Sequence, residues 1–252
     1  MRIFLSSNIS CKADCKYCFS KWPDYDWKTS SEFEYECMSS NSIILYPCCD
    51  GDFFDQVELV EKIKSYTEFD KKVYISISSK INPTKNQIIQ LIELNEWLIK
   101  AGNGFVKFAI SLSNRTMLDE IEPATMTYEE RIKLAAYIHS LGMPLSLTIK
   151  PILPFISKEE YDSILKDFSP YLNRVLIGGL YVNQSSEFYI NYLRKLYPCT
   201  IRKVEWLPEQ PHWNYVENEA LMENIRISAQ KLNMQVFDSD FFVVKSWMEE
   251  IN

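Results

Sequence analysis

Six short apolar segments alternate with helix-forming patterns along most of the chain, and this alternation constrains the fold more than any other feature. The segments are rich in Ile, Leu, Val and aromatic residues and lie at residues 3–5, 42–46, 73–78, 105–112, 145–149 and 174–177. Helix starts between them are marked by Asn82 before Pro83 and by capping boxes that open at Thr127 and Ser157. Strands that alternate with helices form parallel βαβ units with right-handed crossovers. The sequence therefore predicts an α/β fold, a partial (β/α)6 TIM barrel.

Residues 185–252 are predicted to form a C-terminal α/β extension that follows a barrel core of residues 1–184. The extension carries a helical pattern at residues 217–232 and a late strand candidate at residues 234–237. We expect it to cover the open side or the mouth of the barrel. Less regular helices are expected near residues 31–37 and from residue 53 onward.

The composition is that of a globular protein that can bury a substantial core, with 46% hydrophobic and 24% charged residues. The formal net charge of −7 disfavours a broad nucleic-acid surface, although a local basic groove stays open as an alternative. No apolar run reaches the length that crosses a bilayer, and the first apolar segment is too short for a secretory signal. We therefore expect a cytoplasmic protein in a reducing compartment.

Three cysteines lie close together directly after the first apolar segment. Cys11, Cys15 and Cys18 form a C-x3-C-x2-C pattern, and thiolate is the usual protein ligand of iron–sulfur clusters. A zinc site would normally need a fourth ligand, and the two histidines, His139 and His212, are far away in the sequence. A disulfide set is disfavoured because the chain has seven cysteines, an odd number. Chance spacing is the remaining alternative.

This stretch resembles the signature of the radical S-adenosylmethionine superfamily, C-x3-C-x-aromatic-C, with Tyr17 at the aromatic position. The resemblance implies a [4Fe–4S] cluster held by Cys11, Cys15 and Cys18, with S-adenosylmethionine on the open iron. An electron from the cluster would release a 5′-deoxyadenosyl radical that takes hydrogen from the substrate, and Tyr17 would lie against the adenine. It also implies an external reductant of the flavodoxin or ferredoxin type. The superfamily core is a partial (β/α)6 barrel, so motif and strand pattern agree.

An acidic turn follows the second predicted strand, at the end where parallel barrels bind their ligands. It consists of Asp50, Gly51 and Asp52. In the superfamily a Gly-Gly-Glu-like motif holds the methionyl amino group here, and the resemblance gives Asp52 the acidic role. A plain turn is the alternative, because Asp-Gly is a common turn dipeptide.

Hydroxyl groups and a lysine follow the third and fourth predicted strands. Ser79 and Lys80 offer groups for a carboxylate or a ribose, and Ser111 and Ser113 offer neutral groups that suit a ribose diol. Any single serine at a strand end could equally cap a helix or close a turn. The prediction therefore rests on the whole set.

The order of these pieces resembles the spore photoproduct lyase-like branch, which includes DNA repair photolyase-like proteins. The runs CDGDFFDQVE, SISSK, ISLS and EPATMTYEERIKLAAYIHSLGMPLSLTIKPILP carry this resemblance, which covers residues 2–180. It implies that Ser79 and Lys80 contact S-adenosylmethionine, with Ser111 and Ser113 nearby. Glu122 and Arg131 would form an internal ion pair that supports the site.

The lyase uses a cysteine to return a hydrogen atom, and the resemblance makes Cys48 and Cys49 candidate donors. A buried cysteine that acts as a small hydrophobic residue is the alternative for each of them. A second cluster built from Cys37, Cys48, Cys49 and Cys199 is disfavoured because their spacing is irregular.

The sequence thus favours a radical S-adenosylmethionine enzyme that acts on a small-molecule or nucleotide-type substrate. DNA repair of the spore photoproduct lyase kind is an alternative, which the acidic net charge disfavours. Two other functions stay open: a non-catalytic binding module supported by a metal-tied loop, and an electron-transfer centre without radical chemistry.

Overall fold

The computed structural model describes residues 1–5, 11–22, 41–55, 63–64, 71–194, 196–204 and 212–251. The helix expected near residues 31–37 lies outside these ranges, and so does Cys37. The helix expected from residue 53 lies partly outside them, and its described start is a 3-10 turn, η2 (Phe53–Asp55).

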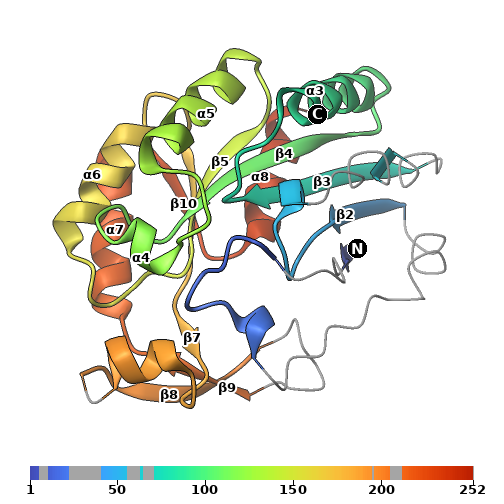
Figure 1. Ribbon diagram of the computed structural model, residues 1–252. Coiled ribbons are helices and arrows are strands. Elements are labelled where there is room, and N and C mark those ends of the chain that lie inside the picture. Colours follow the sequence, from blue (N-terminus) through green and yellow to red (C-terminus); the bar gives the residue numbers. More distant parts are fainter. Residues whose placement is uncertain are drawn as a thin grey trace.

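Seven strands of the described chain form one parallel sheet in the order β1-β2-β3-β4-β5-β6-β10. Their bounds are β1 (Arg2–Phe4), β2 (Ser42–Tyr46), β3 (Lys72–Ser79), β4 (Gly104–Leu112), β5 (Leu145–Ile149), β6 (Arg174–Ile177) and β10 (Gln235–Phe237). The first six strands are neighbours in both sequence and space, and every neighbouring pair is parallel. The six predicted strands are confirmed, and the fold is the predicted α/β partial barrel (Figure 1).

Helical elements surround this curved sheet. The helical elements are η1 (Phe19–Lys21), α3 (Lys85–Lys100), α4 (Leu118–Ile121), α5 (Tyr128–Ser140), α6 (Lys158–Phe168), η3 (Tyr189–Leu193), α7 (Glu219–Lys231) and α8 (Asp240–Ile251). Figure 1 shows α3, α5 and α6 arranged around the outer side of the strands. Among the described helices, none combines the length and apolar character needed to cross a membrane.

The start of α3 differs from the sequence prediction. The helix begins after Thr84, not after Asn82 and Pro83. Thr84 accepts a hydrogen bond from the backbone N–H of Gln87 at 3.2 Å, and the Gln87 side chain accepts one from the Thr84 N–H at 2.9 Å. This capping box satisfies the free backbone donors two residues later than the Asn-Pro pair would.

The two other predicted capping boxes have different outcomes. The box formed by Thr127 and Glu130 at the start of α5 is confirmed. At the start of α6, Ser157 accepts a hydrogen bond from the Glu160 N–H, but the Glu160 carboxylate does not return to Ser157. It accepts instead from the backbone N–H and the hydroxyl of Thr116, so this box is only half formed.

Side chains alternate between the two faces of the sheet, and helices cover both faces. Ile77 and Phe108 belong to the main core beneath the outer helices. Tyr74 and Phe105 point the other way and pack with Val244 of α8. The C-terminal helix α8 therefore lies against the inner face of the barrel sheet.

A buried ion pair fixes the first turn of α8 to this inner face. Asp240 accepts a hydrogen bond from the Ser76 hydroxyl at 2.5 Å and forms a salt bridge with the fully buried Lys107. Ser76 and Lys107 are register partners on β3 and β4. Since an unpaired buried lysine would be costly, the position of α8 depends on Asp240.

The extension contributes to the barrel sheet itself. The strand expected at residues 234–237 is confirmed as β10, and it pairs with β6 at the edge of the sheet. The predicted covering of the open side or mouth by the extension stays a prediction. Three further strands form a small antiparallel sheet in the order β7-β9-β8, seen at the bottom of Figure 1. These are β7 (Tyr181–Val182), β8 (Cys199–Lys203) and β9 (His212–Val216). The domain boundary at residues 184–185 stays a prediction.

Gly104 allows β3 and β4 to approach each other. It has a φ of +138°, and a Cβ atom there would lie 1.9 Å from the Val73 carbonyl oxygen. We expect Gly104→Ala to lower the free energy of unfolding by about 3 kcal/mol, because the backbone must move. Gly102→Ala is the matched control, since Gly102 has a φ of +67° and a Cβ atom there would meet no heavy atom within 4 Å. It should cost only about 1–2 kcal/mol. Urea unfolding measures both, and equal losses would contradict the steric argument.

Candidate functional site

The three motif cysteines lie on the loop that follows β1, and all three are free thiols. Cys15 is buried, whereas Cys11 and Cys18 are half-buried. Backbone contacts hold the loop across the strand ends. The Lys12 N–H donates to the Asp55 carboxylate at 2.9 Å, and the Lys16 N–H donates to the Ile121 carbonyl at 2.9 Å.

The thiols influence one another electrostatically. Burial raises the pKa of Cys15 to about 12, and Cys18 and Cys11 add to this rise, while Lys80 opposes it. Burial also raises the pKa of Cys11, with a further contribution from Cys18. Thiolates at such positions need a positive centre beside them, which bound iron would supply.

The donor set therefore suits a soft metal cluster in its chemistry. No group of three or more His, Cys, Asp or Glu side chains in the described ranges converges closely enough for one metal ion. In a four-iron cluster each thiolate binds a separate iron, so the three sulfurs need not meet at one point.

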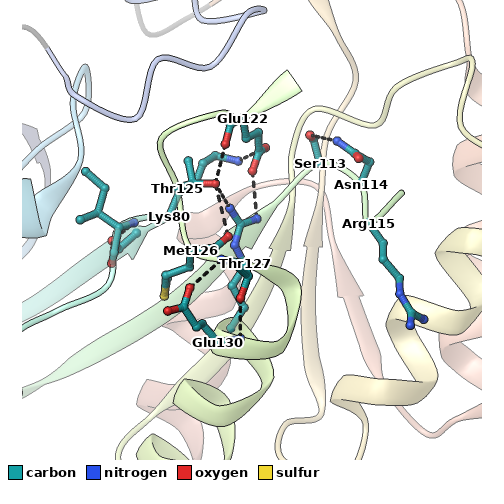
Figure 2. Close-up of polar contacts among 12 residues, drawn as sticks. Lys80, Ser113, Asn114, Arg115, Glu122, Thr125, Met126, Thr127 and Glu130 are labelled. Atoms are coloured by element: carbon teal, nitrogen blue, oxygen red, sulfur yellow. Dashed lines mark hydrogen bonds and ion pairs between the residues drawn. The ribbon is translucent and has the colours of Figure 1, made fainter. Parts of the chain in front are cut away.

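Glu122 is the centre of the polar contacts beside the cysteine loop. Its carboxylate accepts a hydrogen bond from the Tyr17 hydroxyl. It also accepts one from the Lys80 ammonium at 2.6 Å (Figure 2). The Arg131 guanidinium forms a buried salt bridge with its other oxygen at 2.9 Å and donates to Thr125 at 2.5 Å. The predicted ion pair of Glu122 and Arg131 is confirmed.

These contacts keep Glu122 ionised in spite of its burial. Burial alone would raise the pKa of this carboxyl, but Lys80 and Arg131, with the hydrogen bonds from Lys80 and Tyr17, lower it to about 2. Burial raises the pKa of Tyr17 well above its ordinary value, and the Glu122 charge adds to this. Tyr17 thus stays a neutral phenol, and Lys80 lies 5.5 Å from the centre of its ring.

Asp52 organises the ends of β2 and β3. It accepts hydrogen bonds from the Ser79 hydroxyl and the Lys80 N–H at 2.6 Å each, from the Phe54 N–H at 3.1 Å and from the Ile81 N–H at 3.2 Å. Both carboxylate oxygens are therefore engaged within the protein. The predicted contact of Asp52 with a methionyl amino group stays a prediction, as does that of Ser79 with S-adenosylmethionine.

The other predicted residues occupy different parts of the same region. Asp50 and Gly51 are half-buried in the turn before Asp52. Ser113 is fully buried, accepts a hydrogen bond from Asn114 at 3.0 Å and lowers the pKa of the nearby Tyr17. Figure 2 shows Ser113 and Asn114 together at the end of β4.

Cys48 and Cys49 face different surroundings, although they are adjacent. The pKa of Cys48 is raised by burial and by the charges of Asp50, Asp52 and Cys11, and its side chain packs against the main core. The pKa of Cys49 is raised by burial and, among other charges, by that of Asp240 on the inner face. Its thiol donates to the Tyr46 carbonyl at 3.5 Å.

Several polar side chains of the inner face are absent from the predicted site residues. Ser146, Thr148 and Lys150 alternate with the buried residues Leu147 and Ile149, so they lie on the inner face of β5 or directly after it. This period-two pattern is visible in the sequence.

Two further residues near the inner face have weaker sequence signals. Ser78 is exposed, whereas the predicted Ser79 is buried against Asp52. Asp240 is far away in the sequence, and no motif marks it.

Of the cysteines considered for a second cluster, Cys199 lies on β8 and Cys37 is outside the described residues.

Solved structures with the same arrangement of elements include those of spore photoproduct lyase. One variant of this lyase superposes with a TM-score of 0.61 at 11% identity, over 94% of this chain and 82% of the lyase. A variant with bound AdoMet and dinucleoside spore photoproduct gives a TM-score of 0.63 at 12% identity, over 89% and 73%. This chain has the lyase fold.

A second match is Streptococcus suis SuiB bound to S-adenosylmethionine, with a TM-score of 0.56 at 14% identity. It covers 93% of this chain but only 45% of SuiB. No protein-family model and no curated protein sequence matches the chain. The resemblance to the spore photoproduct lyase branch is thus confirmed at the level of the fold.

Within this lyase fold, the pairing of Glu122 predicts a measurable stability effect. Glu122→Gln leaves Lys80 and Arg131 without their shared charge, so we expect the free energy of unfolding to fall by about 3–5 kcal/mol at neutral pH. Because the folded pKa is lowered, the contribution is complete above the ordinary value of 4.5 and is lost as the pH falls toward about 2. The difference in the free energy of unfolding between the unmodified protein and Glu122→Gln should therefore decrease as the pH falls over this range.

Urea unfolding at several pH values measures this difference. Glu129→Gln is the matched control, because Glu129 is exposed on α5, the helix that carries Arg131, and should change stability by less than about 1 kcal/mol. If the difference in the free energy of unfolding between the unmodified protein and Glu122→Gln does not change with pH, the ionised Glu122 carboxylate is not the source of the stabilisation.

Proposed function

We propose that this chain is a radical S-adenosylmethionine enzyme in which Cys11, Cys15 and Cys18 hold a [4Fe–4S] cluster. The observation that carries the proposal is the position of three free thiols on one loop, which backbone contacts hold across the strand ends of a lyase fold. S-adenosylmethionine is bound in the solved structures of a lyase variant and of SuiB, which supports the same cofactor here.

When bound, the cluster supplies the electron that cleaves S-adenosylmethionine, and the resulting 5′-deoxyadenosyl radical takes a hydrogen atom from the substrate. The chain positions the groups around this chemistry. Glu122 orients Tyr17 and Lys80 through hydrogen bonds, and Asp52 fixes the backbone of Lys80. An external one-electron donor of the flavodoxin or ferredoxin type completes the proposal.

The substrate that we propose is a small molecule or a nucleotide-type compound. The dinucleoside spore photoproduct in one lyase structure supports a nucleotide-type compound. The net charge of −7 favours a compound of this size over duplex DNA, since it would oppose a long contact with the phosphate backbone. DNA repair of the lyase kind is the second candidate function, and the same lyase structures support it.

Of the two candidate hydrogen donors, we favour Cys49, because it lies near enough to Asp240, the partner of Ser76 on the inner face, for the two charges to interact. In this step the S–H bond of Cys49 breaks, a C–H bond forms on the substrate radical, and a thiyl radical remains. One electron from the external reductant and one proton restore the thiol.

The first test is anaerobic reconstitution with iron and sulfide, reduction with dithionite and addition of S-adenosylmethionine. We expect 5′-deoxyadenosine from the unmodified protein and none from Cys15→Ala, because the cluster loses a ligand. S-adenosylmethionine should also change the EPR spectrum of the reduced protein, a readout that needs no substrate. Zinc in place of iron, or a cluster that ignores S-adenosylmethionine, would instead favour the binding module or the electron-transfer centre.

The second test separates ligands from other cysteines by iron analysis. Cys48→Ala and Cys49→Ala should bind as much iron as the unmodified protein, because neither residue belongs to the three-cysteine loop. Cys11→Ala and Cys18→Ala should lose the four-iron spectrum. Loss of iron in either of the first two variants would assign that cysteine to the cluster instead.

A further inference from the structure

The residues on both sides of Cys18 contact aromatic side chains from the C-terminal part of the chain. Before it, the Tyr17 ring meets the Phe188 ring edge-on, with 6.1 Å between the ring centres. After it, the centre of the Phe19 ring lies 5.7 Å from that of Trp213 on β9. Phe188 and Trp213 are both buried. The cysteine motif therefore packs against a part of the chain that comes after the strands β1 to β6.

A tight turn after Cys18 brings a second aromatic residue to Trp213. The Lys21 N–H donates to the Cys18 carbonyl at 3.4 Å. The Trp22 N–H donates to the Phe19 carbonyl at 3.0 Å. The Trp22 ring then lies 4.7 Å from the Trp213 ring, with 47° between the two planes. Both ends of this turn thus contact one side chain of the small antiparallel sheet, which the blue cysteine loop approaches in Figure 1.

Trp213 is itself well packed within the small antiparallel sheet. It lies on the middle strand, β9, where it is the register partner of Arg202 on β8. The Tyr181 ring of β7 packs edge-on against it at 5.9 Å, and Val204 belongs to the same apolar cluster. Groups carried by a packed strand are positioned more precisely than groups on a loop. Trp213 is therefore a fixed support for the cysteine loop.

The other two motif cysteines are supported by a different part of the fold. Backbone N–H groups next to Cys11 and Cys15 donate to groups of the barrel core. The Cys18 N–H donates to the Cys15 carbonyl at 3.2 Å, which is a bond within the loop. Aromatic pairs add stabilisation beyond the area that they bury, and they prefer particular geometries. The ring contacts with Trp213 therefore join the chain beyond Cys18 to the rest of the fold.

We propose that Trp213 is a positioning residue for the iron–sulfur cluster, which acts through Phe19 and Trp22 to hold the Cys18 thiol in place. This inference rests on the proposed function, because it takes Cys18 to be a cluster ligand. A cluster needs its thiolates at fixed separations, so release of one end of the loop should weaken iron binding before it unfolds the barrel. The C-terminal extension thereby contributes to the cluster site through a residue that is not a ligand.

Alkylation of thiols in the cluster-free protein, followed by tryptic peptide mass spectrometry, tests this role. Trypsin cleaves after each lysine of the loop, so the three motif cysteines lie on separate peptides. We expect Trp213→Ala to raise the alkylation rate of Cys18 relative to that of Cys15 by about threefold or more, because loss of the ring contacts favours local opening. Trp213→Phe should restore most of the original ratio, because it keeps an aromatic ring.

The matched control is Trp247→Ala. Trp247 is half-buried on α8 and packs with a different apolar cluster, so its replacement should leave the ratio of Cys18 to Cys15 alkylation unchanged. Trp22→Ala removes one contact from the loop side and should raise the ratio even where Trp213→Ala folds poorly. Adding Trp22→Ala to Trp213→Ala should raise the ratio little further, because both substitutions remove the same contact.

The reconstituted protein gives a second readout. Trp213→Ala should lose iron and show an altered EPR spectrum of the reduced cluster, whereas Trp213→Phe and Trp247→Ala should match the unmodified protein. An unchanged alkylation ratio in both Trp213→Ala and Trp22→Ala would overturn the inference. An equal rise in Trp247→Ala would also overturn it, because the effect would then come from a general loss of stability.

The 5′-deoxyadenosine assay of the unmodified protein keeps the two proposals apart. Cleavage of S-adenosylmethionine together with an unchanged alkylation ratio would reject only the role of Trp213. A raised ratio in a protein that takes up no iron–sulfur cluster would reject the proposed enzyme class and leave Trp213 as a support of the loop.

Discussion

The buried carboxylate of Glu122 is the constraint on which the candidate site depends. An ionised carboxylate away from water is costly unless cations and hydrogen-bond donors surround it. Here the donors come from three parts of the chain: Tyr17 from the cysteine loop, Lys80 from the end of β3 and Arg131 from α5. Because no single part can satisfy the charge, the carboxylate holds all three in one arrangement, and the cysteine loop is positioned as a result.

Asp52, like Glu122, holds separate parts of the chain together by accepting their hydrogen bonds. Its role is therefore structural in the described chain. A carboxylate accepts about four hydrogen bonds, and Asp52 receives four from Ser79, Lys80, Ile81 and Phe54. Little capacity is left for a ligand. Acidic residues at strand ends thus fix the backbone that surrounds the site, whereas the groups with remaining capacity are the thiols and the hydroxyls of the inner face.

The sequence predicts the features that depend on local patterns, which are the six strands, the cysteine loop and the capping box at Thr127. It does not predict α8 on the inner face, because the hydrogen bond of Asp240 to Ser76 joins residues 164 positions apart. Composition alone also does not show which of Ser78 and Ser79 faces Asp52. The face of Lys150 can be predicted from the sequence, because the alternation of polar and apolar residues along β5 continues to it and puts it on the polar face.

The position of α8 also limits what can enter the barrel. Val244 packs against Tyr74 and Phe105, so the inner face is filled with apolar side chains at this level of β3 and β4. The polar residues of the inner face begin at Asp240 and continue toward the strand ends. In the enzyme that we propose, a substrate on the inner face would enter from the strand ends and stop above the first turn of α8. Such a site would suit the proposed small molecule, or one small group of a larger molecule, because the Lys107–Asp240 pair that anchors α8 would limit its depth.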